Sequence, residues 1–134
     1  MSKTKLNGVY NKGVYWPEGI DCVIDHIMSY HYSVIASRHV KERIAQYQLA
    51  PNCFKIALKG ETVEAEFVNG KLVKIINRIH DKNDETRDIC VAVRFDLNER
   101  TTCYANVITL WLNNRDDNHC TIRVENYERG IMCM

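Results

Sequence analysis

The sequence predicts an α+β fold, in which N-terminal helices pack on one face of a roughly five-stranded, mostly antiparallel sheet. Two observations predict it. Apolar residues recur at helical spacing in the N-terminal part of the chain, and from residue 61 onward they alternate with polar residues as they do in strands. The 134 residues, 46% of them hydrophobic, are enough for one domain with a core and too few for two.

Residues 1–33 are predicted to form an arm and a first helix. Residues 1–16 contain Gly8 and Gly13 and show no sustained period, which indicates an extended arm. Pro17 suits the first turn of a helix. Apolar residues at helical spacing follow it: Ile20, Val23, Ile24, Ile27 and Met28. The first helix is therefore expected at roughly 18–30.

The segment SRHVKERIAQYQL predicts a second helix, with Ser37 as its N-cap. Its apolar stripe consists of Val40, Ile44 and Tyr47. The helix should end near Ala50, because a residue before proline disfavours the α region. The next segment, PNCFKIALKG, predicts a short third helix that Gly60 closes in the left-handed conformation.

The strands begin with the segment TVEAEFV, in which Val63, Ala65 and Phe67 alternate with two glutamates. The pair Asn69-Gly70 is a strong hairpin signal, so KLVKIINRI should be the partner strand. Three further strands are predicted at ICVAVRF, CYANVITLWL and HCTIRV. The polar segments HDKNDETRD, LNERTT and NNRDDN separate them, and we interpret these as solvated turns.

The composition limits the classes of function. Eighteen Lys and Arg against seventeen Asp and Glu leave a net charge of +1, so any site for a polyanion must be local. No run of about 18 apolar residues could span a membrane. The six cysteines are widely spaced and no signal-peptide core is seen, which predicts structural thiols in a cytoplasmic protein. No phosphate-binding glycine motif or zinc signature occurs, so no cofactor is expected.

Two stretches could carry chemistry. His39 and Arg43 lie four residues apart and share one face of the second helix, where an imidazole beside a guanidinium suits a phosphate. In the last strand His119, Thr121 and Arg123 alternate onto one face, which is then polar. Each stretch has an ordinary alternative, a solvated helix face for the first and surface polar residues beside a hairpin loop for the second. A metal site at Asp116-Asp117 beside His119 is a further alternative.

The order of these features resembles the small ribonuclease-toxin domains of the barnase-EndoU-colicin-RelE superfamily, of phage or mobile-element type. The resemblance runs from RHVKERI through GETVEAEFVNGKLVKII and NVITLWLNN to DDNHCTIRVENY, over residues 34–127, and leaves residues 1–33 outside. It implies a metal-independent endoribonuclease in a bacterial cytoplasm. The ribose 2′-hydroxyl would attack the adjacent phosphate and leave a 2′,3′-cyclic phosphate, and a protein partner would neutralise the toxin.

The resemblance also implies roles for particular residues. His39 and His119 would be general base and general acid, in either order, and Arg43 would bind the scissile phosphate while Thr121 stabilises the charge that develops on it. Trp111 or Tyr127 would stack on a base. The expected substrate-binding residues are Arg78, Asn106, Thr109, Trp111, Asn113, Arg123 and Tyr127.

The same fold could instead serve as a non-catalytic module that binds RNA or protein, such as an inhibitor or an antitoxin-like partner, because a fold does not fix a function. Catalysis predicts that His39 and His119 converge in one concave site with Arg43 beside them. A binding module needs no such convergence. The sequence leaves the oligomeric state open.

Overall fold

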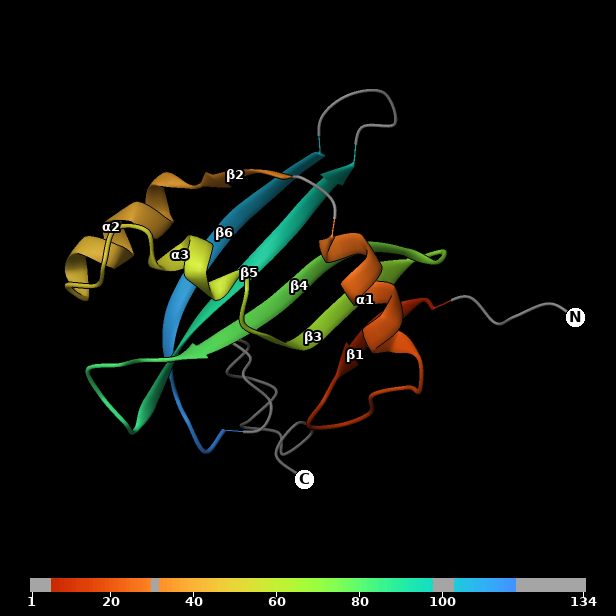
Figure 1. The fold of residues 1–134 in the computed structure, drawn as a ribbon, viewed down its shortest axis with the longest axis horizontal. Helices are drawn as coiled ribbons and strands as arrows, with labels where there is room; N and C mark the ends of the chain where they lie inside the picture. Colours follow the sequence, from red (N-terminus) through yellow and green to blue (C-terminus); the bar gives the residue numbers. More distant parts are fainter. Residues whose placement is uncertain (1–5, 30–31, 98–102, 118–134) are drawn as a thin grey trace, which may run out of the picture.

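The computed structural model describes residues 6–29, 32–97 and 103–117 and shows an α+β fold (Figure 1). These residues form helices α1 (Ile20–Met28), α2 (Arg38–Gln46) and α3 (Cys53–Ala57). They also form strands β1 (Gly8–Asn11), β2 (Tyr32–Ala36), β3 (Glu61–Val68), β4 (Lys71–His80), β5 (Arg87–Leu97) and β6 (Cys103–Asn114). The predicted last strand, HCTIRV, lies outside the described residues.

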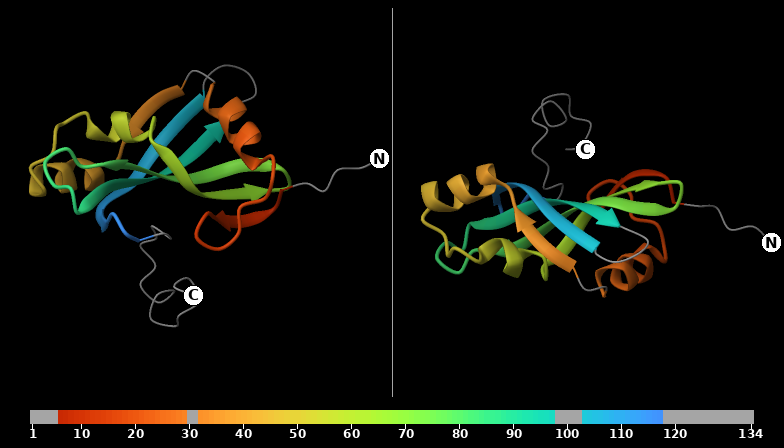
Figure 2. Two further views of the ribbon diagram at one scale, coloured as in Figure 1. Left: turned by 60° about the horizontal axis from the view of Figure 1, so that its bottom comes forward. Right: turned by 90° about the horizontal axis from the view of Figure 1, so that it is seen from above.

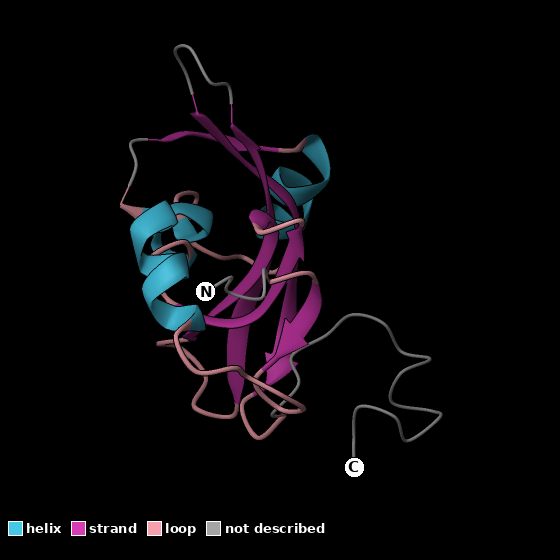
Figure 3. Cartoon of the chain, turned by 90° about the vertical axis from the view of Figure 1, so that its right-hand side faces the viewer, coloured by secondary structure: helices cyan, strands magenta, loops and turns pink. Residues whose placement is uncertain are grey.

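The six strands form one sheet in the order β1-β3-β4-β5-β6-β2. Every pair of neighbouring strands is antiparallel except β6 and β2, which run parallel at one edge of the sheet (Figure 2). The sheet is strongly twisted (Figure 3). Strands β1 and β2 were not predicted, because each has only four or five residues and its pairing partner is distant in the sequence. The predicted extended arm therefore contains an edge strand.

Apolar side chains fill two clusters, one on each face of the sheet. The first face is defined by Ile75, Val91 and Leu110, which share a buried cluster with residues of all three helices. The helix residues in that cluster are Ile20, Ile24, Val40, Ile44, Cys53 and Ala57. The second face carries a smaller buried cluster of Val63, Ile76, Cys90, Ala92 and Trp111.

The prediction that Val63 shares a face with Ala65 and Phe67 is wrong. The register of β3 against β4 shifts between Thr62 and Glu64, which marks a β-bulge. The extra residue reverses the alternation, so Val63 belongs to the second cluster while Ala65 and Phe67 belong to the first. The residues before Val63 therefore point to the opposite face from the one that simple alternation with Ala65 and Phe67 would give.

Three local predictions can be compared with the structure. The Ser37 side chain accepts a hydrogen bond from the Val40 N–H at 3.1 Å, which confirms the N-cap of α2. The hairpin turn is also confirmed, with φ of 51° at Asn69 and 83° at Gly70. The left-handed cap at Gly60 is wrong, because φ there is not positive. Glycine is needed because a Cβ at Gly60 would lie 2.4 Å from the carbonyl oxygen of Arg78.

Candidate acid-base site

The two residues expected on α2 do not form a site with each other. His39 is exposed, and Arg43 is half-buried. The Arg43 Nη1 donates to the Tyr47 hydroxyl at 2.6 Å, and its guanidinium lies 5.9 Å from the centre of the Tyr47 ring. Arg43 is thus held along its own helix. His119 lies outside the described residues, so its convergence with His39 stays a prediction.

Most of the other expected residues lie on β6 or outside the described residues. Thr121, Arg123 and Tyr127 lie outside the described residues. Asn106, Thr109 and Asn113 are half-buried on β6, and the Asn113 amide donates to Asp117 Oδ2 at 3.0 Å.

Trp111 is only 8% exposed, and its indole N–H is buried without a hydrogen-bond partner in the described part of the chain. Its ring therefore presents no open surface for a stacked base, contrary to the expectation from the sequence.

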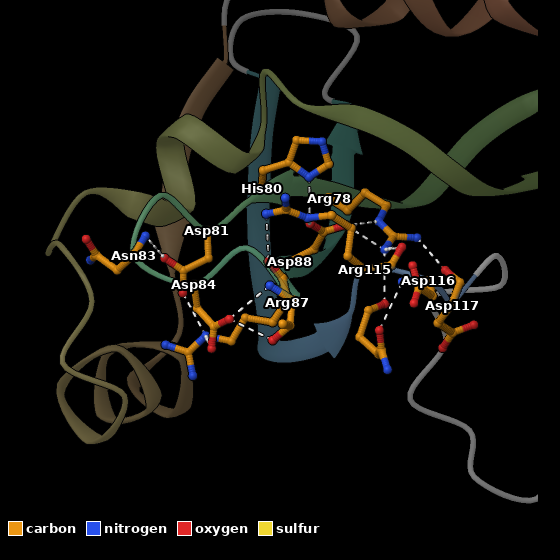
Figure 4. Close-up of polar contacts among 12 residues, drawn as sticks. Arg78, His80, Asp81, Asn83, Asp84, Arg87, Asp88, Arg115, Asp116 and Asp117 are labelled. Atoms are coloured by element: carbon orange, nitrogen blue, oxygen red, sulfur yellow. Dashed lines mark hydrogen bonds and ion pairs between the residues drawn. The ribbon is translucent and has the colours of Figure 1, made fainter.

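A cluster of charged side chains lies instead around Asp88, at one end of the second face (Figure 4). Asp88 is 1% exposed. Its Oδ1 lies 2.7 Å from His80 Nδ1 and accepts from Arg115 Nε at 3.1 Å, and its Oδ2 accepts from Arg78 Nε at 2.7 Å. One buried carboxylate thus holds an imidazole and two guanidinium groups.

The strand register brings these residues together. Arg78 and His80 are two residues apart on β4 and therefore point to the same face. In the β4–β5 ladder His80 pairs with Asp88 and Arg78 pairs with Cys90, a residue of the second cluster. Arg115 follows directly after β6, whose last residue pairs with Arg87. Three strand ends contribute side chains to one site.

Arg78 fixes the polar turn that follows β6. Its Nη1 donates to the Asp117 carbonyl at 2.6 Å, and its Nη2 donates to the carbonyls of Asn114 and Arg115 at 3.3 and 3.2 Å. The side chain is 9% exposed. Arg78 was predicted from the sequence to bind substrate. In the structure the N–H groups of its guanidinium donate to Asp88 and to backbone carbonyls of the turn. Arg78 positions the site.

The charge of Asp88 follows from these contacts. Burial acts to raise its pKa, but hydrogen bonds from His80, Arg78 and Arg115 and the positive charge of Arg78 outweigh burial and lower the pKa below 3.8. Asp88 is therefore ionised at neutral pH. An ionised carboxylate on Nδ1 of His80 orients the ring and leaves Nε2 to exchange protons.

His80 presents its ring to solvent beside a concavity. Its side chain is 71% exposed, although the carboxylate that holds it is buried. The concavity has a volume of about 280 Å³, and its lining includes Gly60, Glu61 and His80, with Arg78 and Asp88 below. An imidazole with a fixed orientation and an open nitrogen is suited to general acid-base catalysis.

Glu61 supplies a second titratable group to the same concavity. It is the first residue of β3 and pairs with Arg78 in the ladder. The next residue, Thr62, donates to Asn77 Oδ1 at 2.6 Å, so Glu61 points to the opposite side, toward Arg78 and His80. Side chains in this diagonal relation have Cβ atoms roughly 7 Å apart, a spacing that can span a phosphate.

The loop between β4 and β5 is also more ordered than a solvated turn. Asp81 is buried and accepts from Arg87 Nε at 2.7 Å, which corrects the interpretation of this aspartate as solvated. Asp84 accepts from the hydroxyl and the backbone N–H of Thr86, and these hydrogen bonds lower the pKa of Asp84. The loop closes the hairpin tightly beside His80.

No site role was predicted from the sequence for His80, Asp88 or Glu61. A usable signal was present: Arg78 and His80 alternate at the end of one strand, and Asp88 begins the next strand across a short loop. The pairing of a histidine and an aspartate across a hairpin was hidden by the surrounding charged residues, which by themselves indicate a solvated turn.

A larger concavity, of about 520 Å³, is lined by residues of α1, β2 and α3 and by first-face residues of the sheet. Its lining is mostly apolar, and the charged residues on it are Asp25, Lys55 and Lys59. It contains no histidine and none of the residues selected from the sequence. The histidine that is held by a buried carboxylate therefore lies at the smaller concavity, on the second face.

No group of three or more His, Cys, Asp or Glu side chains in the described ranges is arranged to hold a metal ion. Within the same ranges, no helix is long and apolar enough to cross a membrane.

Comparison with known proteins gave no match: no protein family, curated protein or solved structure was found to be similar to this chain. The resemblance to ribonuclease toxins therefore stays a prediction from the sequence.

Proposed function

We propose that this chain is a metal-independent endoribonuclease, with His80 and Glu61 as its acid-base pair. The observation that carries the proposal is the arrangement of these two side chains around one concavity, with the His80 ring held by the buried Asp88. The reaction is the one that the sequence resemblance implies. The proposed acid-base residues differ from the His39 and His119 of the resemblance, because His80 and Glu61 line one concavity.

In the proposed reaction Glu61 accepts the proton of the ribose 2′-hydroxyl, and the 2′-oxygen attacks the adjacent phosphorus. The bond from phosphorus to the 5′-oxygen breaks, and His80 gives its Nε2 proton to that oxygen. The products are a 2′,3′-cyclic phosphate and a 5′-hydroxyl. Glu61 and His80 regain their starting protonation by exchange with water. Positioned acids and bases of this kind contribute about 10²–10⁴-fold each.

Asp88 and Arg115 support this chemistry electrostatically. To act as the acid, His80 gives up the proton on Nε2, while the Asp88 carboxylate, 2.7 Å from Nδ1, fixes the orientation of the ring. Arg115 is held beside that carboxylate at 3.1 Å and is partly exposed, so we assign it to the charge that develops on the phosphoryl oxygens. The proposed reaction therefore requires only a local cluster of positive charge, which is consistent with the net charge of +1.

The test is incubation of the purified protein with total cellular RNA in EDTA, followed by analysis of the fragment ends. We expect cyclic phosphates from the wild type and a loss of about 10²–10⁴-fold in His80→Ala and in Glu61→Gln. His26→Ala, which changes an exposed histidine on α1, is the matched control and should cleave normally. Loss of cleavage in His80→Ala and Glu61→Gln, purified in the same way, would also exclude a contaminating nuclease.

The same assay decides between the two site assignments. Loss of cleavage in His39→Ala and His119→Ala, with His80→Ala unaffected, would place the reaction at the site that the resemblance implies. RNA that stays intact with the wild type would refute the enzyme and favour the binding module. An active enzyme would act in the bacterial cytoplasm and would require a neutralising protein in the cell that makes it.

A further inference from the structure

A second concavity, of about 340 Å³, adjoins the one that contains His80. The two share Glu61 and Arg78 as lining residues, and Lys12, Gly13 and Val63 complete the lining of the second. Glu61 therefore stands between two hollows of similar size. Neither Lys12 nor this second hollow has a role in the reaction described above.

The backbone at Lys12 is fixed against β3. Asn11 is buried, its Oδ1 accepts from the Gly13 N–H at 2.8 Å, and its Nδ2 donates to Glu64 Oε1 at 3.0 Å. The Lys12 N–H donates to the Val63 carbonyl at 2.9 Å, at the bulge of β3. These hydrogen bonds fix the backbone from which the Lys12 side chain extends into the lining of the second concavity.

The Lys12 ammonium group is placed but not buried. Its Nζ lies 3.3 Å from Glu61 Oε2 and 5.4 Å from the centre of the Trp16 ring. Both partners of the ion pair are solvent-accessible, and such pairs contribute only about 0–1 kcal/mol. A phosphate can therefore replace the Glu61 carboxylate as the partner of Lys12 at little cost.

We propose that the Lys12 hollow binds the nucleotide on the 5′ side of the scissile phosphate, with Lys12 paired to that nucleotide's own 5′-phosphate. This inference rests on the proposed function, because it takes Glu61 as the base. The 2′-hydroxyl that Glu61 deprotonates belongs to the nucleotide on the 5′ side of the scissile bond. RNA that runs from His80 past Glu61 therefore continues in the 5′ direction toward Lys12.

The order of the strands supports this path. His80 is on β4, Glu61 is on β3, and Lys12 follows directly after β1, the next strand in the sheet. Neighbouring strands are about 4.8 Å apart, so the three groups form a row across the sheet with Glu61 in the middle. The substrate class is then single-stranded RNA with a phosphate one nucleotide upstream of the cleaved bond.

The test compares three mixtures of dinucleotides: unmodified, with an added 5′-phosphate, and with an added 3′-phosphate. For the wild type we expect the 5′-phosphate to raise kcat/KM by up to about fivefold, the effect of one solvent-accessible ion pair, and the 3′-phosphate to leave it unchanged. In Lys12→Gln the ratio between 5′-phosphorylated and unmodified dinucleotides should fall to about one. Lys41→Gln, an exposed lysine on α2, should keep the wild-type ratio.

The same comparison is made for binding, with 2′-deoxy dinucleotides that cannot be cleaved. Tighter binding of the 5′-phosphorylated form that is lost in Lys12→Gln supports the subsite even if no RNA is cleaved, and the failure then concerns the proposed function alone. Equal values for all three mixtures, a gain from the 3′-phosphate, or a gain that persists in Lys12→Gln would overturn the inference.

Discussion

Replacing Asp88 by asparagine should destabilise the protein strongly, because it leaves the buried Arg78 guanidinium without its counter-charge. Asparagine keeps nearly the same volume and one accepting oxygen, so the change isolates the charge. Asp88 is 1% exposed and Arg78 is 9% exposed. Breaking a buried pair by removing one partner costs about 3–5 kcal/mol. A domain is stable by about 5–15 kcal/mol, so about a fifth or more of the total should be lost.

The assay is urea denaturation followed by circular dichroism, in which the midpoint should fall while the slope stays constant. The control is Asp116→Asn, which changes an exposed carboxylate in the turn after β6 and should shift stability by less than about 0.5 kcal/mol. A free energy of unfolding for Asp88→Asn within about 1 kcal/mol of the wild type would refute the reasoning. It would mean that Arg78 is adequately solvated by the carbonyl groups of the turn.

Two further predictions concern pH and thiol reactivity. Because the folded-state pKa of Asp88 is lowered below its ordinary 3.8, its stabilising contribution should be complete above that value and be lost as the pH falls through the lowered pKa. When the pH is lowered from neutral to acidic, the urea midpoint should therefore fall less in Asp88→Asn than in the wild type. An equal fall of the midpoint in both proteins would contradict this. Burial raises the pKa of the Cys53 thiol, so Cys53 and the buried Cys90 should react with a thiol reagent only after unfolding, whereas the exposed Cys22 reacts in the native protein. Mass spectrometry of the labelled peptides checks the order, and equal labelling of Cys22 and Cys53 would contradict it.

The elements that the sequence predicted are those with local signals. Helix α2 has its Ser37 cap, and the β3–β4 hairpin has Asn69 and Gly70, so both follow from residues that are close in the chain. Strands β1 and β2 could not be predicted in this way. Their backbone groups pair with β3 and β6, which lie far along the sequence, and short edge strands carry little periodicity of their own.

The candidate site was harder to predict, because buried charge has the same sequence pattern as solvated charge. Arg78 was selected, but for a contact with substrate, and Asp88 and His80 were interpreted as part of a polar turn. Their burial depends on the register of three strands and on the turn that ends at Asp117. The bulge at Val63 adds a reversal of faces that alternation alone does not reveal.

A final prediction separates the structural role of the buried pair from its role in positioning His80. An apolar pair often replaces a buried ion pair without loss of stability, whereas one unpaired buried charge is costly. The double variant Arg78→Met/Asp88→Leu should therefore be more stable than Asp88→Leu alone, in which the buried Arg78 has lost the Asp88 carboxylate. The two changes should couple by at least about 1 kcal/mol, because the side chains are in contact.

RNA cleavage by the double variant should nevertheless fall as far as in His80→Ala, because the ring has lost the carboxylate on its Nδ1. A double variant that is stable and still cleaves RNA at the wild-type rate would show that the Asp88 cluster serves the fold alone. A double variant that is stable and inactive would explain why the chain keeps charge in its core: the buried Asp88 is needed where it orients an exposed imidazole.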